Sequence, residues 1–562
     1  MIQRRYLTLI IVLAIFSGSA FYASQFGNDF GGVSVQTVTI DGPGYDISGV
    51  LYTPKILTGK VPAFALAHGV SNSKEVLGGV ALELARNGYV ALIIDEKGHG
   101  ESDSGLGVSD PTLGLGSALT YLKSLPYVDF NRIGVGGHSM GAGSVRAVVS
   151  SNLALAATIL IGGGHGDDAY EPMNKTQPRN LLFIVGKNDV LFDLGSLDAY
   201  LRPVFGSLNS IAPGAVYGEF GDGTARKLVV LETIHLLEPI DPAAVHEIVE
   251  WANSALHPEV SYPLTVKTQT YLFREGLMLI SLTSFVALVV PLSKVLNHLL
   301  PGSVGEAMQV RHRFLRERRV LLLWSLLGLL LFLPTMLLGV MIPFPPLIFG
   351  ASMAWWFLMT GVAGLIILAI IAMRQFGDKM EIRGHLTGSL RVRDVALGTI
   401  IAMILYASAC ASVALFGEKL RFIVPIFPPL IASRAQILPF FTPFYLIYFA
   451  VEGLFLHVYR ERQMAGTAAG SLMRTIMLKL APYLAVLTVQ YLPMFAANYR
   501  LLPSYIGFFI EFIWVIVPLL LISTFISWWL YRYTGRIWAG IVLNTLLFAW
   551  ASAGLFPFTA FR

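Results

Sequence analysis

The stretch Arg132-Ile133-Gly134-Val135-Gly136-Gly137-His138-Ser139-Met140-Gly141-Ala142-Gly143 decides the fold of the first half of the chain. An apolar run of strand type meets a Gly-x-Ser-x-Gly match at Gly137, Ser139 and Gly141, and a helix-like segment follows at once. A serine at a sharp strand-to-helix turn sits in strained backbone geometry, and small neighbours let strand and helix pass closely. The stretch predicts an exposed nucleophile, Ser139. A Gly-rich turn with an incidental serine is the alternative.

Composition divides the chain into two parts. Of its 562 residues, 55% are hydrophobic and 13% are charged, which is too apolar for a wholly soluble protein. Residues 30–258 have ordinary soluble composition, whereas residues 266–562 fall into apolar runs of helix-spanning length. We expect a soluble domain followed by an all-α polytopic transmembrane domain of about eight helices. The expected spans are 272–297, 319–342, 347–373, 395–416, 437–459, 475–497, 505–531 and 537–556.

The N-terminal segment, residues 1–26, has the pattern of an export signal. Arg4 and Arg5 precede an apolar run at residues 6–23, which suits either a cleaved secretory signal or an uncleaved signal-anchor. Residues 18–20 would serve as a cleavage site. The anchor is favoured because the apolar run approaches membrane-spanning length. In either case the positive flank stays in the cytoplasm and the following segment is exported.

The positive charges predict the orientation of the membrane domain. Four basic segments follow the first, third, fifth and seventh expected spans, at residues 311–319, 374–393, 460–474 and 532–536. All four fall on one side, which the positive-inside rule assigns to the cytoplasm. We therefore expect a multi-pass protein of the cell (plasma) membrane with its soluble domain extracytoplasmic. The lipid bilayer accounts for these charges, so no nucleic-acid partner is expected.

The soluble part alternates strand-like and helix-like segments. Two segments around an Asp41-Gly42 turn predict an antiparallel hairpin at the sheet edge. The later strand-like runs are almost continuously apolar, as in strands buried on both faces. The expected strands are 33–40, 45–52, 63–67, 90–94, 133–135, 157–161, 181–185 and 228–231. A helix is expected at 73–86, with Asn72 and Glu75 spaced as a capping box. The pattern predicts an α/β fold with a doubly wound, mostly parallel sheet, whose active site lies at the carboxyl ends of the strands.

Polar motifs follow these strands in a recognisable order. His68-Gly69 follows the first parallel strand, Gly98-His99-Gly100-Glu101-Ser102 follows the next, and the stretch around Ser139 comes third. With these motifs, residues 45–257 resemble the α/β-hydrolase superfamily. The resemblance is strongest to the branch of dienelactone-hydrolase-like esterases, acyl-CoA thioesterase-like proteins and prolyl-oligopeptidase-like peptidases. It implies a serine hydrolase in which the nucleophile, the acid and the histidine follow one another along the chain.

The acid of the implied triad is predicted to be Asp189. It follows the strand-like run at residues 181–185, and so lies at a carboxyl end of the sheet. Asp167 and Asp168, in the loop after the preceding strand, are the alternatives, and a surface turn residue would look the same in the sequence.

The base is predicted to be His235, which follows the last expected strand. His246 competes with it, but its segment has a helical pattern, and a helical histidine is more often a structural or surface residue. His68 and His138 are interpreted as scaffold histidines that orient loops.

The oxyanion hole needs two backbone N–H groups aimed at the developing negative charge. Met140 follows the nucleophile and Val70 follows the His-Gly turn, and the resemblance assigns these two positions to the hole.

This chemistry requires no metal or cofactor. His68, His99 and His138 follow different strands without the short spacing of zinc ligands. The only cysteine, Cys410, lies inside an apolar run, so no disulfide and no thiolate metal site is expected.

The membrane part is expected to form one wall of the active site. The connection between the strands at 157–161 and 181–185 is too short for a large cap, and we expect the membrane domain to shield the site instead. Glu452 and Glu511 lie inside expected spans, where carboxylates are functional candidates. Glu452 is expected to reach out to the cytoplasmic interface, which leaves Glu511 as the stronger candidate.

Two functions of different class follow. In the first, a membrane-anchored serine hydrolase cleaves an ester, thioester or amide of a small-molecule, lipid or peptide substrate outside the cell. In the second, the membrane domain is transporter-like or sensory, and the hydrolase domain is regulatory or inactive. The sequence favours the first because the serine, the acid and the histidine are all present, and it leaves the oligomeric state open.

Overall fold

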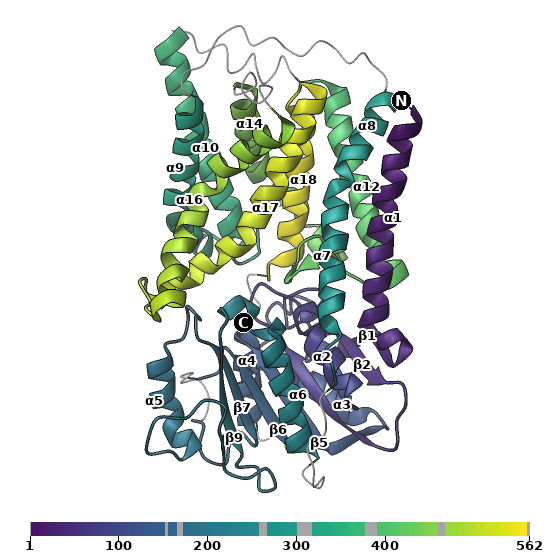
Figure 1. Cartoon of the computed structure of the whole chain (residues 1–562), viewed down its shortest axis with the longest axis vertical. Helices are drawn as coiled ribbons and strands as arrows, with labels where there is room; N and C mark the ends of the chain where they lie inside the picture. The colour runs from purple at the N-terminus through teal and green to yellow at the C-terminus, as the bar shows by residue number, and fades with distance from the viewer. Residues whose placement is uncertain are drawn as a thin grey trace.

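The computed structural model describes residues 2–151, 155–165, 172–257, 267–300, 317–376, 390–458 and 467–558. Figure 1 shows two parts stacked along the long axis of the molecule. The sheet domain comprises the elements from β1 to α6. The helical bundle comprises α1 and the elements from α7 onward. The N-terminal end of α1 lies at the end of the bundle away from the sheet domain (Figure 1).

The sheet domain is built on one twisted sheet of nine strands in the order β1-β2-β4-β3-β5-β6-β7-β9-β8. Neighbours from β4 to β9 pair in parallel, whereas the β1–β2, β2–β4 and β8–β9 pairs are antiparallel. The strands are β1 (Val33–Asp41), β2 (Asp46–Pro54), β3 (Val61–Ala67), β4 (Val90–Ile94), β5 (Val128–His138), β6 (Ala157–Ile161), β7 (Leu181–Gly186), β8 (Val216–Tyr217) and β9 (Arg226–Leu231). The α/β, mostly parallel fold class expected from the sequence is confirmed.

Helices cover both faces of this sheet. Every residue of β4 and β6 is buried, because apolar side chains project to both faces and meet a helix layer on each. On one face the strands share a core with α2 (Gly78–Arg86) and α6 (Pro242–Leu256). On the other they share a core with α3 (Leu115–Ser124), α4 (Met140–Ser150) and α5 (Leu194–Phe205).

Two local expectations need correction. The two-residue strand β8 was not predicted from the sequence, being too short to show a pattern. The expected helix at 73–86 starts as a 3-10 helix, Lys74–Leu77, before α2. The capping box does not form, because Asn72 Oδ1 accepts from the neighbouring Ser73 N–H, and Glu75 binds the Ser73 hydroxyl and Lys419. Lys419 comes from the bundle, so a distant contact overrides the local capping pattern.

Nine helical segments among the described residues are long and apolar enough to cross a membrane, one near the N-terminus and eight after the sheet domain. The eight agree with the expected spans. The bundle helices are α1 (Ile2–Gly27), α7 (Tyr271–Ala287), α8 (Val289–Leu299), α9 (Glu317–Met341), α10 (Gly350–Phe376), α12 (Val392–Phe416), α14 (Leu438–Val458), α16 (Ala468–Ala497), α17 (Ser504–Thr534) and α18 (Trp538–Leu555).

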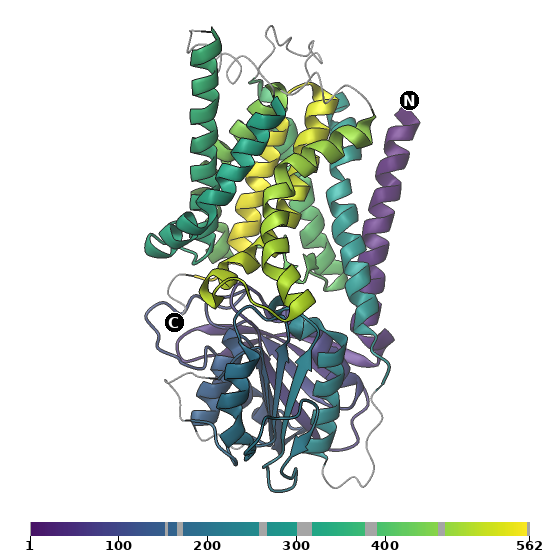
Figure 2. The same ribbon diagram turned by 60° about the vertical axis from the view of Figure 1, so that its left-hand side comes forward.

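The N-terminal helix α1 is packed into the bundle. It runs alongside α7 in both views (Figures 1 and 2). The rings of Phe16 and Phe285 lie 6.1 Å apart between centroids, and those of Phe26 and Phe273 stack at 5.3 Å. The segment predicted as a signal or anchor therefore contributes side chains to the core of the bundle.

Glu452 in α14 does not reach out of the bundle as the sequence suggested. Its side chain is buried, forms an ion pair with Lys479 of α16, and accepts a hydrogen bond from Ser527 of α17 at 2.9 Å. Burying a lone charge in an apolar bundle costs free energy. The ion pair with Lys479 and the hydrogen bond from Ser527 offset this cost for Glu452. Three helices are thereby joined through one carboxylate.

The bundle contacts the edge of the sheet at which the parallel strands end. Lys419, between α12 and the short hairpin β10 (Arg421–Phe422) and β11 (Val424–Pro425), lies 2.6 Å from a carboxylate oxygen of Glu75 and 2.8 Å from one of Glu101. Arg434 donates a hydrogen bond of 3.0 Å to the Gly98 carbonyl. These partners in the sheet domain belong to the segments that follow β3 and β4, so the bundle faces the carboxyl ends of the strands.

Candidate active site

The turn at Ser139 has the geometry that its sequence predicts. β5 ends at His138 and α4 begins at Met140, which leaves Ser139 between them with φ 53° and ψ −112°. This is the left-handed region, which strains a residue with a side chain. A Cβ added at Gly137 would lie 2.2 Å from the Gly141 carbonyl oxygen, so the close approach of strand and helix requires glycine.

Asp189 and His235 meet above the sheet. Asp189 follows β7, and His235 opens the 3-10 helix His235–Ile240 that follows β9. His235 Nδ1 and Asp189 Oδ2 are 2.8 Å apart, and both side chains are buried. The carboxylate thus fixes the ring and leaves Nε2 as the nitrogen that can serve a nucleophile.

The alternative for the base stands apart from this pair. His246 lies on α6, half exposed, beside Glu250 at 3.2 Å. Asp167 and Asp168 lie outside the described residues.

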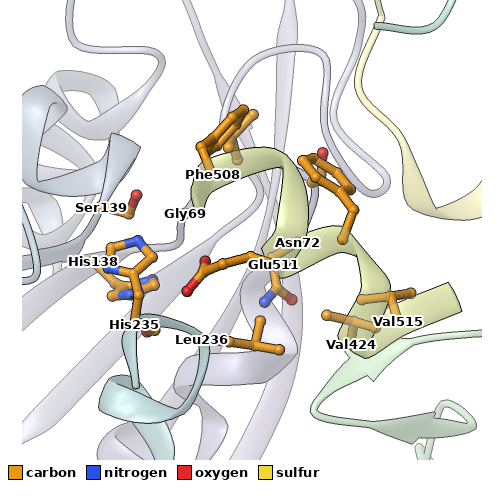
Figure 3. Close-up of a pocket in the computed structure, with 13 residues that line it drawn as sticks. Gly69, Asn72, His138, Ser139, His235, Leu236, Val424, Phe508, Glu511 and Val515 are labelled. Atoms are coloured by element: carbon orange, nitrogen blue, oxygen red, sulfur yellow. Dashed lines mark hydrogen bonds between the residues drawn. The ribbon is translucent and has the colours of Figure 1, made fainter. Parts of the chain in front are cut away.

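Ser139 and His235 line the same pocket (Figure 3), and Val70 also belongs to its lining. Within the described residues no hydrogen bond joins the Ser139 hydroxyl to His235. Such bonds are often long in unliganded enzymes and tighten when substrate binds. Met140 is the first residue of α4, where backbone N–H groups have no partner within the helix.

Two further side chains belong to this centre, and the sequence analysis did not place them there. His138, interpreted as a scaffold histidine, lines the pocket, and its ring lies 4.7 Å from that of His235 between centroids. Its Nε2 is 3.1 Å from the His235 carbonyl oxygen and 3.4 Å from Glu238 Oε2. Glu238 is fully buried, 3.5 Å from His235 Nδ1, and accepts a 2.5 Å hydrogen bond from the Gly186 N–H. The sequence could have indicated Glu238 through its spacing, because it follows His235 by three residues, which is one turn of a 3-10 helix.

Burial and charge set the protonation of these groups. Burial and the charge of His235 hold the pKa of His138 well below its usual range. Burial and the charge of Asp189 raise the pKa of Glu238 well above its usual range, which favours its neutral form. Burial alone would lower the pKa of His235, but the charge and hydrogen bond of Asp189 outweigh it and raise that pKa to about 10.

One set of side chains in this centre has the composition of a metal site. The nearest ligand atoms of His138, His235 and Glu238 all lie within 4.8 Å of one another. His235 Nδ1, which lies 3.5 Å from Glu238, also contacts Asp189, so a metal bound through this nitrogen would compete with Asp189 for it. His68 and His99, named with His138 in the sequence analysis, stack on each other with ring centroids 5.2 Å apart.

The wall opposite Ser139 comes from the helical bundle. Four residues of α17 line the pocket at i, i+3, i+4 and i+7, namely Phe508, Glu511, Phe512 and Val515. Val424 of the β10–β11 hairpin adds to this wall. In Figure 3, the Glu511 carboxylate points toward His138 and His235. The pocket offers about 70 Å³ to water-sized molecules, and residues of the bundle contribute to its lining.

The bundle also forms hydrogen bonds with the loop that carries Asp189. Arg500, in the turn between α16 and α17, donates a hydrogen bond of 2.7 Å to the Asp189 carbonyl oxygen and another to the Phe192 carbonyl oxygen. A guanidinium that bridges two carbonyls fixes the loop in one geometry.

Arg500→Ala is therefore expected to lower kcat/KM by about tenfold to a hundredfold, because small displacements of a catalytic group cost rate of that order. Initial rates on a small ester would measure it. Arg202→Ala is the matched control, since Arg202 forms a partly exposed pair with Asp198 on α5 and should leave the rate within about twofold. Equal rates for both variants would show that Asp189 is held without Arg500.

Comparison with known proteins is consistent with this fold. Residues 61–187 match the family model described as serine aminopeptidase, S33. The matched range includes Ser139 and ends before Asp189 and His235, so it does not bear on the acid or the base. A search among curated proteins found no match.

A search of solved structures found matches that cover about two fifths of this chain. A hypothetical protein from Pseudomonas aeruginosa is 17% identical, with 40% of this chain and 94% of that chain covered and a TM-score of 0.30. A putative dienelactone hydrolase from Klebsiella pneumoniae subsp. pneumoniae is 13% identical over 41% of this chain and 99% of that chain, with a TM-score of 0.29. An α/β hydrolase from a Penicillium species is 14% identical over 40% of this chain and 99% of that chain, with a TM-score of 0.31.

Proposed function

The sheet domain of this chain is an α/β-hydrolase domain, and from that premise we propose that the protein is a membrane-anchored serine hydrolase. Its substrate would be an ester, thioester or amide, cleaved through the triad Ser139, Asp189 and His235. The observation that carries the proposal is the buried 2.8 Å contact between His235 and Asp189 in the pocket that Ser139 lines. Parallel strands bring these three residues together from distant parts of the sequence.

The proposed reaction proceeds through an acyl-enzyme. Neutral His235 takes the proton of the Ser139 hydroxyl as the oxygen attacks the scissile carbonyl, and Asp189 stabilises the imidazolium that forms. The carbonyl oxygen becomes an oxyanion, and the N–H groups of Val70 and Met140 are the proposed donors to it. Each such donor is typically worth about 3 kcal/mol in the transition state. His235 then protonates the leaving group, and water releases the acyl group by the reverse sequence.

A fluorophosphonate probe tests the proposal directly, because it reacts covalently with an activated serine. The full-length protein should be labelled on Ser139, as located by peptide mass spectrometry, whereas Ser139→Ala should remain unlabelled. Absence of labelling in the wild-type protein would favour the other hypothesis, in which the hydrolase domain is regulatory or inactive and the membrane domain is transporter-like or sensory.

We further propose that the protein lies in the cell membrane with the hydrolase domain outside the cytoplasm. The positive-inside rule applied to the basic segments supports this orientation. Much of those segments lies outside the described residues. The helix ends that flank them, such as the end of α10 and the start of α16, are at the end of the bundle away from the hydrolase domain (Figure 1).

Cysteine labelling in intact cells tests this orientation. In a Cys410→Ser background, Ser210→Cys in the hydrolase domain should react with a membrane-impermeant maleimide, whereas Ala469→Cys at the start of α16 should react only after lysis. Both positions are exposed in the structure, and reaction of Ala469→Cys after lysis would show that its thiol is accessible from the cytoplasmic side, so the difference reports the side of the membrane. The reverse pattern would place the hydrolase domain in the cytoplasm.

A further inference from the structure

Glu511 is a carboxylate placed in the pocket by the helical bundle. It belongs to the face of α17 that includes Phe508, Phe512 and Val515, and it is the polar member of that face. Its Oε1 is shielded from solvent and forms no hydrogen bond of normal geometry among the described residues, and the nearby donor from the bundle is the Tyr491 hydroxyl of α16, which is itself buried without such a bond. A buried carboxylate oxygen without a partner costs free energy, which a ligand that donates a hydrogen bond would recover.

The position of Glu511 indicates which part of a substrate it would meet. Its carboxylate points toward His235 (Figure 3), and its charge contributes to the raised pKa of that histidine. In the proposed reaction His235 protonates the leaving group, so the leaving group departs on the His235 side of Ser139. Glu511 therefore faces the alcohol or amine portion of a substrate rather than the acyl portion.

We propose that Glu511 is a specificity-determining residue that binds a hydrogen-bond donor, a hydroxyl or a protonated amine, on the leaving group of the substrate. Phe508 and Phe512 pack against the carbon atoms beside that donor. The preferred substrates are then esters of polar alcohols, such as diols or amino alcohols, held under an apolar helix face. This inference rests on the proposed hydrolase function and adds the substrate class that the site selects.

Pairs of acetate esters of equal shape test it on the full-length protein. The first pair is 2-hydroxyethyl acetate and propyl acetate, which differ by a hydroxyl in place of a methyl. The second is 2-(dimethylamino)ethyl acetate and 3-methylbutyl acetate, which differ by a protonated nitrogen in place of a CH group. The measured quantity is the ratio of kcat/KM within each pair, so a change in overall rate cancels.

The wild-type protein is expected to prefer the donor-bearing ester of at least one pair by about tenfold to a hundredfold, the range for a hydrogen bond to a charged group. Glu511→Leu should abolish that preference. Glu511→Gln should keep a preference for the hydroxyl, because an amide oxygen still accepts, and lose a preference for the cation. The pair that shows the preference identifies the hydroxyl or the amine as the recognised group.

Phe512→Leu is the matched control, because it alters the same helix face without changing its charge. It should change both members of each pair alike and leave the ratios within about twofold. Labelling of Ser139 in Glu511→Leu by the fluorophosphonate probe shows that the nucleophile is intact. If the Glu511→Leu variant reacts with the probe but keeps the wild-type kcat/KM ratios, the inference is overturned. It is also overturned if the substitution only shifts the pH profile, and shifts it equally for all four esters. Failure of the wild-type protein to label would instead overturn the proposed hydrolase function.

Discussion

Ser139→Ala is expected to lower kcat on any accepted ester by about 10⁶-fold, the loss seen where nucleophile, base and acid act as a unit. The physical reason is that Ser139 stands at the junction of β5 and α4 and lines the same pocket as His235, the proposed base. Initial rates from purified wild-type and variant protein, compared at equal concentration, would measure the loss. His235→Ala should cost about as much.

The fold should survive the Ser139 substitution. Serine and alanine both carry a Cβ, so the backbone strain at φ 53° is the same in the two proteins. Circular dichroism and thermal unfolding should therefore be unchanged, which separates lost chemistry from lost structure. Ser144→Ala is a useful control, because Ser144 lies on α4 and donates a hydrogen bond to the buried Glu96 without lining the pocket. A Ser139→Ala protein that kept substantial activity would show that the triad assignment is wrong.

Local sequence predicts the strained turn at Ser139 because the residues that cause it are neighbours in the sequence. Ser139 needs only a strand, a helix and two glycines within a few residues, and the chain supplies all of them in one stretch. Asp189 and His235 are predictable for a related reason. Each directly follows an apolar strand, and parallel strands deliver their ends to one edge of the sheet.

The other members of the site depend on packing that one sequence does not show. Glu238 fits beside His235 only because Gly162 lacks a side chain, since a Cβ there would lie 1.9 Å from Glu238 Oε2. Glu511 could be named as an intramembrane carboxylate, but its place in the pocket depends on how α17 lies against the sheet domain. Gly507 at that contact packs against Val190, beside the acid of the triad. Such long-range contacts leave no periodic pattern in the sequence.

The two domains share one centre through these contacts. Arg500 holds the backbone of Asp189, Glu511 faces the imidazole of His235, and Phe508 and Phe512 close the pocket above Ser139. A rearrangement of α17 would therefore alter the acid, the base and the pocket wall together. The membrane domain thus has the means to influence both the rate and the choice of substrate, which a simple anchor would lack.

Asp189→Asn is expected to lower kcat/KM by about 10⁴-fold at neutral pH and to change its pH dependence. The asparagine amide can donate to His235 Nδ1, which would place the ring proton on Nε2, where a base must accept one. The pH dependence follows from the pKa of about 10 for His235 in the native protein. The base works only when neutral, so a raised pKa means that the wild-type kcat/KM rises with pH and reaches half its maximum near pH 10.

Removing the Asp189 charge removes the strongest influence that raises this pKa, while burial, which lowers it, remains. The residual activity of Asp189→Asn should therefore reach its plateau at a lower pH than that of the wild-type protein. Asp193→Asn is the matched control, because Asp193 caps α5 in the same segment and asparagine caps a helix equally well. Profiles of kcat/KM from pH 6 to 10.5, on an ester whose leaving group does not titrate there, would show the shift. A wild-type profile already flat above pH 7, or a midpoint unmoved by Asp189→Asn, would mean that Asp189 does not control the charge of His235.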